Sequence, residues 1–133
     1  MPVSWEIQES VLIVTVIEDW RGGGPATAIA EAMADPAFKP GTALLLDVRQ
    51  SGMNPSAEEV RSRAEWLSAL STKGLYKHLA VVVGTRAYQM GVARMAQIFL
   101  GCREMDLQIF VDIEAAMSWV CGLKGANQQG TNH

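Results

Sequence analysis

Apolar residues recur along the chain with two different periods, and these periods predict the order of strands and helices. Residues 3–8 (VSWEIQ) alternate between apolar and polar, and residues 11–17 (VLIVTVI) form an almost unbroken apolar run. Only Glu9 and Ser10 separate the two. Alternation and β-branched residues favour strands, so the chain is predicted to begin with a hairpin that leads into a buried strand.

Helical and strand patterns alternate after the hairpin. Pro25 suits a first helical position, and Ile29 and Met33 share one face with several alanines, so a short helix is predicted up to Asp35. The remaining elements are predicted as strand 42–48, helix 56–72, strand 79–84, helix 87–101, strand 107–111 and helix 113–123.

This order predicts a single α/β domain. Because every strand after the first pair is followed by a helix, we expect a mostly parallel five-stranded sheet with an antiparallel first strand and about four helices. Residues 124–133 (KGANQQGTNH) are polar and show no periodicity. They are predicted to be a disordered tail behind a domain of residues 1–123.

Composition narrows the class of protein. The 133 residues are 49% hydrophobic and 19% charged, which is typical of a soluble globular chain. The apolar runs, such as 79–83 (LAVVV), are too short to span a membrane, and the start of the chain shows no secretory signal, so we expect a cytoplasmic protein of bacterial type. The net charge is -3 and the 11 Lys and Arg residues are scattered, which argues against nucleic-acid binding.

Side chains for metal or nucleophilic chemistry are scarce. His78 precedes a strand and His133 ends the polar tail, while Cys102 and Cys121 are too far apart in sequence to form a redox pair or a metal knuckle. We therefore expect no metal, no cofactor and no enzymatic activity.

A glycine-rich segment between the hairpin and the first helix resembles part of a phosphate-binding loop. In the pattern Gly22-x-Gly24-x-x-Thr27 the third glycine of the dinucleotide fingerprint is missing, although Asp47 ends the next strand at about the expected distance. No lysine with Ser or Thr follows the glycines, as a P-loop requires. A turn that leads into the helix is favoured over a nucleotide site.

Charged residues follow several strands of the predicted sheet. The carboxyl ends of parallel strands meet at one edge, where ligands of open α/β sheets collect. Helix capping and surface ion pairs are the alternative explanation, and they are favoured for Asp112. The candidate ligand or partner surface at this edge comprises Asp19, Trp20, Arg21, Asp47, Arg49 and Arg86.

The two long helices contain further candidates. Ser56 and Glu59 form a Ser-x-x-Glu capping box at the start of helix 56–72. Trp66 lies beside Arg63, one position off the apolar stripe of that helix, and is predicted to be half-buried, either completing the core or forming an interaction patch. The predicted core stripe of helix 87–101 consists of Tyr88, Val92, Met95 and Phe99.

Four stretches of the chain combine with the order of elements into a recognisable pattern: 11–20 (VLIVTVIEDW), 44–50 (LLLDVRQ), 79–95 (LAVVVGTRAYQMGVARM) and 109–120 (IFVDIEAAMSWV). This pattern covers nearly all of residues 3–123 and resembles the STAS domain (sulfate transporter and anti-sigma factor antagonist), especially its SpoIIAA-like group. It implies a non-enzymatic regulatory or protein-interaction module with a protein partner, and it is compatible with a homodimer.

The resemblance also implies two kinds of site. Anti-sigma factor antagonists carry a phosphorylatable serine at the start of the helix after the third strand, in an Asp-Ser-Ser-Gly context. Ser56 matches that serine by location, and Ser51 in Ser51-Gly52 is its rival. The wider group is also likened to CRAL-TRIO lipid-binding domains, so the alternative is a domain that binds a small apolar ligand, a lipid or a nucleotide.

Overall fold

The computed structural model describes residues 3–17, 24–52 and 54–131, with side chains described as far as residue 123. Within these residues a hairpin is followed by alternating helices and strands. The elements are β1 (Val3–Gln8), β2 (Val11–Ile17), α1 (Gly24–Met33), β3 (Ala43–Gln50), α2 (Ala57–Leu70), the short 3-10 helix η1 (Ser71–Lys73), β4 (His78–Val82), α3 (Ala87–Gly101), β5 (Asp106–Phe110) and α4 (Ile113–Thr131).

The described strands form one five-stranded sheet in the order β1-β2-β3-β4-β5. β1 pairs antiparallel with β2, and each later pair is parallel. The predicted mixed sheet is therefore confirmed. Glu9 and Ser10 turn the hairpin with φ of 54° and 63°, the left-handed conformation that a tight two-residue hairpin turn requires.

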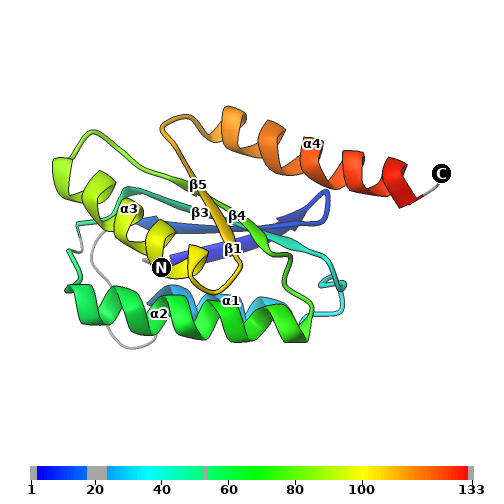
Figure 1. Cartoon of the computed structure of the whole chain (residues 1–133), viewed down its shortest axis with the longest axis horizontal. Coiled ribbons are helices and arrows are strands. Elements are labelled where there is room, and N and C mark those ends of the chain that lie inside the picture. The colour runs from blue at the N-terminus through cyan, green and yellow to red at the C-terminus, as the bar shows by residue number, and fades with distance from the viewer. Residues whose placement is uncertain (1–2, 18–23, 53, 132–133) are drawn as a thin grey trace.

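Helices cover both faces of the sheet, but unequally. α1, α2 and α3 lie on one face, and α4 alone lies across the other (Figure 1). Because side chains alternate along a strand, each buried strand supplies both faces. In β2, Leu12 and Val14 face the three-helix side, whereas Val11 and Ile13 face α4. The continuous apolar run of β2 thus follows from burial on both sides.

The buried face of α3 differs from the predicted stripe. Tyr88, Val92, Met95 and Phe99 are only partly buried. The residues of α3 that lie fully inside are Gln89, Ala93 and Leu100. The fully buried face of α3 is therefore displaced by one position from the predicted stripe. The predicted residues cover the rim of the core, and Phe99 packs against the larger core cluster.

The last helix, α4, continues to Thr131. Because the side chains are described only to residue 123, the disordered tail of residues 124–133 stays a prediction. Among the described residues, none of the helices combines the length and apolar character needed to cross a bilayer.

Candidate functional site

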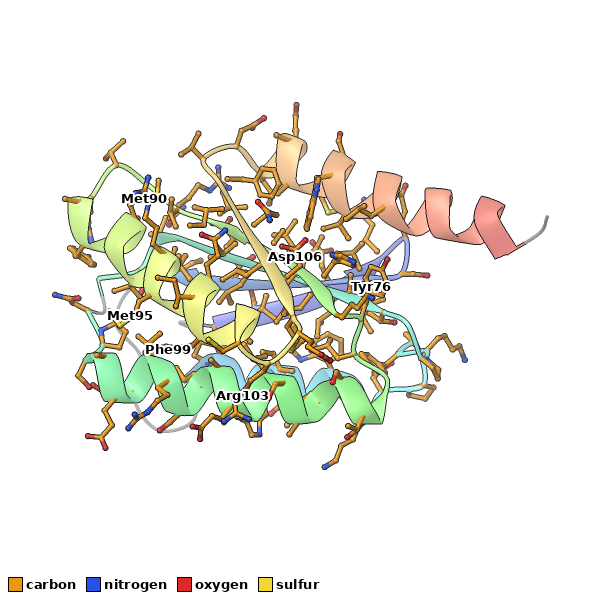
Figure 2. All side chains as sticks on the ribbon, in the orientation of Figure 1. Tyr76, Met90, Met95, Phe99, Arg103 and Asp106 are labelled. Atoms are coloured by element: carbon orange, nitrogen blue, oxygen red, sulfur yellow. The ribbon has the colours of Figure 1, made fainter. Side chains whose placement is uncertain are left out.

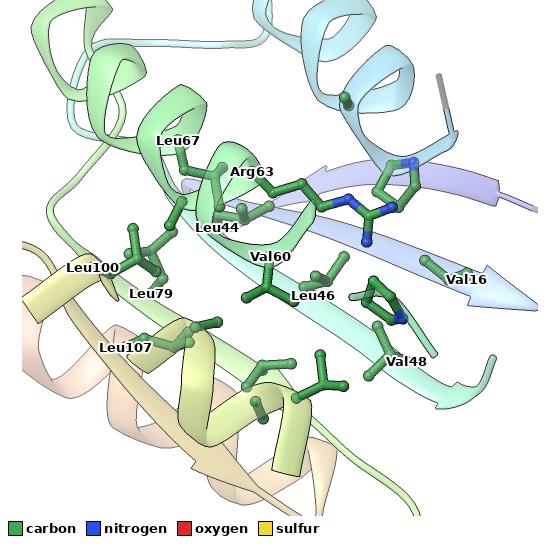
Figure 3. A pocket seen from close by; sticks show the side chains of 18 of the residues that line it. Val16, Leu44, Leu46, Val48, Val60, Arg63, Leu67, Leu79, Leu100 and Leu107 are labelled. Atoms are coloured by element: carbon green, nitrogen blue, oxygen red, sulfur yellow. The ribbon is translucent and has the colours of Figure 1, made fainter. Parts of the chain in front are cut away.

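An apolar cavity of about 190 Å³ lies between α2 and the sheet (Figure 3). Its walls come from the three helices on this face and from β2, β3, β4 and β5. Leu44, Leu79 and Leu107 form part of the sheet side, and Val60 and Leu67 of α2 lie opposite. The cavity is therefore bounded by side chains that the sequence shows only as ordinary core residues.

The cavity exists because α2 packs mainly against α3 and makes little direct backbone contact with the sheet. Phe99 and Arg103 lie at the end of α3 that approaches α2 (Figure 2), and Arg103 Nη2 is 3.3 Å from Glu65 Oε1 of α2. Ala64 and Ala93, which face the space from α2 and α3, are too short to fill it.

Three side chains with a strongly polar group line the described part of the cavity: Ser51, Gln89 and Arg63. Ser51 and Gln89 are each 5% exposed and mark the end near the carboxyl edge of the sheet. Arg63 is half-buried and extends from α2 toward Val16, which lies at the same edge of the sheet (Figure 3). The cavity therefore combines a long apolar wall with polar groups toward the carboxyl edge of the sheet.

The Gln89 side chain ties three elements together at this edge. Its Nε2 donates to the backbone oxygens of Val48, Arg49 and Ser51 at 3.1, 3.4 and 2.9 Å. Its Oε1 accepts from the backbone N–H of Gly84 at 2.6 Å. We call this set of contacts the Gln89 bridge. Since it joins α3 to the ends of β3 and β4, it fixes the position of the helix that walls the cavity.

Glycine is required at position 84 by this bridge. A Cβ there would lie 2.9 Å from both Arg49 O and Gln89 Oε1, closer than real Cβ contacts. The chain thus passes close to a buried amide at a point where a side chain would push it away. The sequence analysis treated Gly84 only as the end of a strand.

Asp47 and Arg49, two residues of the predicted surface, bind each other. Arg49 donates from Nε to Asp47 Oδ1 at 3.0 Å and from Nη2 to Oδ2 at 2.8 Å, and its backbone N–H also donates to Oδ1. The hydrogen bond to Asp47, with the charges of Asp47 and Asp112, raises the pKa of Arg49 above its ordinary value. This bidentate pair stabilises the strand end, and the carboxylate of Asp47 is 9% exposed.

Arg86 and Asp112 also have structural partners. Arg86 donates to Ser51 O at 3.2 Å and to the Tyr88 hydroxyl at 3.0 Å. Asp112 Oδ2 accepts from the N–H of Ala115 at 3.2 Å, which confirms its predicted role as a helix cap. The charged side chains on the described part of this edge thus mainly hold the fold. Asp19, Trp20 and Arg21, with most of the glycine segment, lie outside the described residues.

Ser56 caps α2 as predicted. Its hydroxyl accepts from the N–H of Glu59 at 3.2 Å, and the Glu59 carboxylate accepts from the N–H of Ser56 at 3.0 Å. Hydrogen bonding of its carboxylate with the backbone N–H and the side chain of Ser56, together with the nearby charge of Arg63, lowers the pKa of Glu59. Ser56 is exposed, whereas Ser51 is buried. Of the two candidate switch residues, only Ser56 presents its hydroxyl at the surface.

Replacement of Ser56 by alanine is expected to lower the free energy of unfolding by about 1 kcal/mol, because α2 loses the acceptor for one of its unpaired amides. Denaturant unfolding of the wild type and Ser56→Ala measures the change. Ser62→Ala, at an exposed position in the interior of α2, is the control and should change it by less than about 0.5 kcal/mol. Equal stability of wild type and Ser56→Ala would show that the cap is energetically unimportant.

Trp66 is half-buried and packs against the larger core cluster. It also lines the cavity. Of its two predicted environments, the structure therefore favours completion of the core over an exposed interaction patch. Within the described residues, no group of three or more His, Cys, Asp and Glu side chains is placed to hold a metal ion.

The sequence analysis missed Gln89 and the cavity itself. A glutamine within a helix is normally solvent-exposed, so its burial was not anticipated. One available signal was its spacing, because Gln89 lies four residues before Ala93 and eleven before Leu100 on the same helical face. The cavity had no comparable signal, since its volume depends on how α2 sits above the sheet.

Comparisons with known proteins support the fold. No family model matches the chain, and no curated protein matches it. The structure is similar to that of an uncharacterised protein of the DUF3478 family from Shewanella loihica PV-4, described as having a SpoIIAA-like fold. The match has a TM-score of 0.56 and 15% sequence identity, and covers 90% of this chain and 92% of the other. The chain therefore has a SpoIIAA-like α/β fold, as the resemblance implied.

Proposed function

We propose that this chain is a non-enzymatic regulatory module that binds a small apolar ligand in the cavity beneath α2. The observation that carries the proposal is the cavity, which is walled by apolar side chains and has polar groups toward the carboxyl edge of the sheet. Empty apolar space in a folded protein costs stability, because the lining atoms lose contacts. A ligand that fills the space recovers them.

The size of the cavity limits the ligand. A dry apolar cavity of about 150 Å³ is known to hold benzene, so 190 Å³ accommodates about eight non-hydrogen atoms. A whole phospholipid or a dinucleotide is far larger. The proposal therefore narrows the alternatives considered from sequence to a short-chain or single-ring molecule.

The non-enzymatic part of the proposal rests on the residues that line the cavity. Among its described residues there is no His, Cys, Asp or Glu. Ser51 is the hydroxyl residue of the wall, and a serine nucleophile needs a neighbouring base. Gln89 cannot serve as that base, because an amide does not take up a proton at neutral pH.

The regulatory part of the proposal rests on the fold and on α2. The SpoIIAA-like fold resembles that of anti-sigma factor antagonists, which act through a protein partner. α2 carries cavity residues on one side and the exposed Ser56 cap at its start. A protein partner that contacts the start of α2 would therefore contact the helix that also covers the ligand. A cytoplasmic location belongs to the same proposal.

Titration with neutral linear alcohols tests ligand binding. Calorimetry with 1-hexanol, 1-octanol and 1-dodecanol should give one saturable site, with affinity rising to 1-octanol and not beyond, since the cavity is then full. Saturating 1-octanol should also raise the thermal midpoint, because a ligand that binds only the folded state stabilises it. No saturable heat with any of the three alcohols, and no rise in the midpoint, would contradict the proposal.

A further inference from the structure

Arg63 occupies a distinctive place in the cavity. Among the described lining residues it is the charged one, and it is half-buried. It also borders a shallow polar hollow on the surface, together with Ser56, Glu58, Glu59 and Ser62. A guanidinium group at this position lies where the apolar interior meets the surface.

We infer that the ligand is a small apolar acid whose carboxylate pairs with Arg63 and whose hydrocarbon part fills the cavity. This inference rests on the proposed function and adds the chemical class of the ligand. A guanidinium presents a planar set of N–H donors that matches a carboxylate with two parallel hydrogen bonds. Next to apolar walls, where water is partly excluded, the attraction between the two charges is stronger than in bulk water.

The acidic residues near Arg63 are already engaged with other groups. Glu59 accepts the N–H of Ser56 at 3.0 Å, and Glu58 Oε1 lies 3.8 Å from Arg61 Nη2. Their charges weaken the attraction of Arg63 for an anion but do not reverse it at contact distance. Because a guanidinium carries five N–H donors, interactions that Arg63 makes within the chain are compatible with binding a carboxylate.

The length of the ligand follows from the same geometry. If the carboxylate stays beside Arg63 at the surface, the interior holds the apolar part of about eight non-hydrogen atoms. Octanoate, with seven carbons beyond its carboxylate, fits this requirement. The uncharged partner with the same chain length is 1-octanol, so the two molecules isolate the contribution of the carboxylate.

The test compares the affinities of octanoate and 1-octanol at pH 7, below the concentration at which octanoate forms micelles. Calorimetric titrations use the full chain as wild type, Arg63→Met, Arg63→Lys and Arg61→Met. We expect wild-type protein to bind octanoate about tenfold more tightly than 1-octanol, since a charge-assisted hydrogen bond has roughly that effect. Arg63→Met should abolish the preference, Arg63→Lys should keep part of it, and Arg61→Met should keep it in full.

The outcomes separate this inference from the proposed function. If both molecules bind wild-type protein with equal affinity, the cavity binds ligands but the assignment to acids is wrong. The assignment is also wrong if the preference for octanoate survives in Arg63→Met, or if Arg61→Met removes it as completely as Arg63→Met. If neither molecule binds, the proposed function itself fails.

Discussion

Replacement of Gln89 by leucine is expected to lower the free energy of unfolding by about 3 kcal/mol. Leucine has a similar volume but makes none of the hydrogen bonds of the Gln89 bridge. The N–H of Gly84 loses its acceptor, and the carbonyl of Arg49 loses a donor. Each buried polar group left without a partner costs about 1–3 kcal/mol. Val48 O and Ser51 O lose less, because the N–H of Ser51 still donates to Val48 O, and Arg86 and Tyr88 still donate to Ser51 O.

Urea unfolding of Gln89→Leu and Gln97→Leu provides the measurement and its control. Gln97 also donates from a glutamine Nε2 to a backbone oxygen, at 2.7 Å from Leu107 O, but its side chain is partly exposed. Water can replace that hydrogen bond, so we expect Gln97→Leu to cost less than about 1 kcal/mol. Equal losses in the two variants would show that burial does not strengthen the bridge.

A second variant tests the bridge from its other side. Gly84→Ala introduces a Cβ 2.9 Å from both Arg49 O and Gln89 Oε1, so the strand end or the glutamine must move. We expect this substitution to destabilise the protein although alanine is normally acceptable where φ is negative. If Gly84→Ala were as stable as wild type, the close approach of backbone and amide would not constrain the fold.

Replacement of Ala64 by leucine is expected to abolish binding of 1-octanol while leaving the fold at least as stable as wild type. Ala64 is buried on α2 and faces the cavity, so three added carbon atoms enter existing space. A side chain that fills a void gains contacts, whereas one added to a packed core costs about 1–3 kcal/mol. Loss of binding with retained stability would identify the cavity as the binding site.

Ala32→Leu is the matched control for Ala64→Leu. Ala32 is fully buried on α1 in the same core cluster, but it is not among the residues that line the cavity. The same three carbon atoms should therefore overpack the core there and lower the thermal midpoint. If Ala64→Leu lowers the midpoint as much as Ala32→Leu, the cavity is not open space in solution. If Ala64→Leu still binds 1-octanol, the alcohol binds somewhere other than the cavity.

The sequence alone determined the order and type of the described strands and α-helices, but not the short 3-10 helix η1. The β-branched run at 11–17 and the apolar run at 79–83 became buried strands, because a strand enclosed on both faces needs apolar side chains at every position. The capping box at Ser56 and the cap at Asp112 were also predicted correctly. Both depend on residues that are three positions apart in sequence, so the local pattern carries the information.

The tertiary structure decided how the helices sit on the sheet. The space beneath α2 depends on the separation between α2 and the strands, which is set by contacts between segments far apart in sequence, such as Arg103 with Glu65. The Gln89 bridge likewise joins residues about 40 positions apart. The periodicity of a helix shows which of its faces is apolar. It does not show whether that face packs against backbone carbonyls, against other side chains or over a cavity. For this reason the candidate surface of charged residues was predicted at the sheet edge, whereas the cavity beside it emerged only when the elements were assembled.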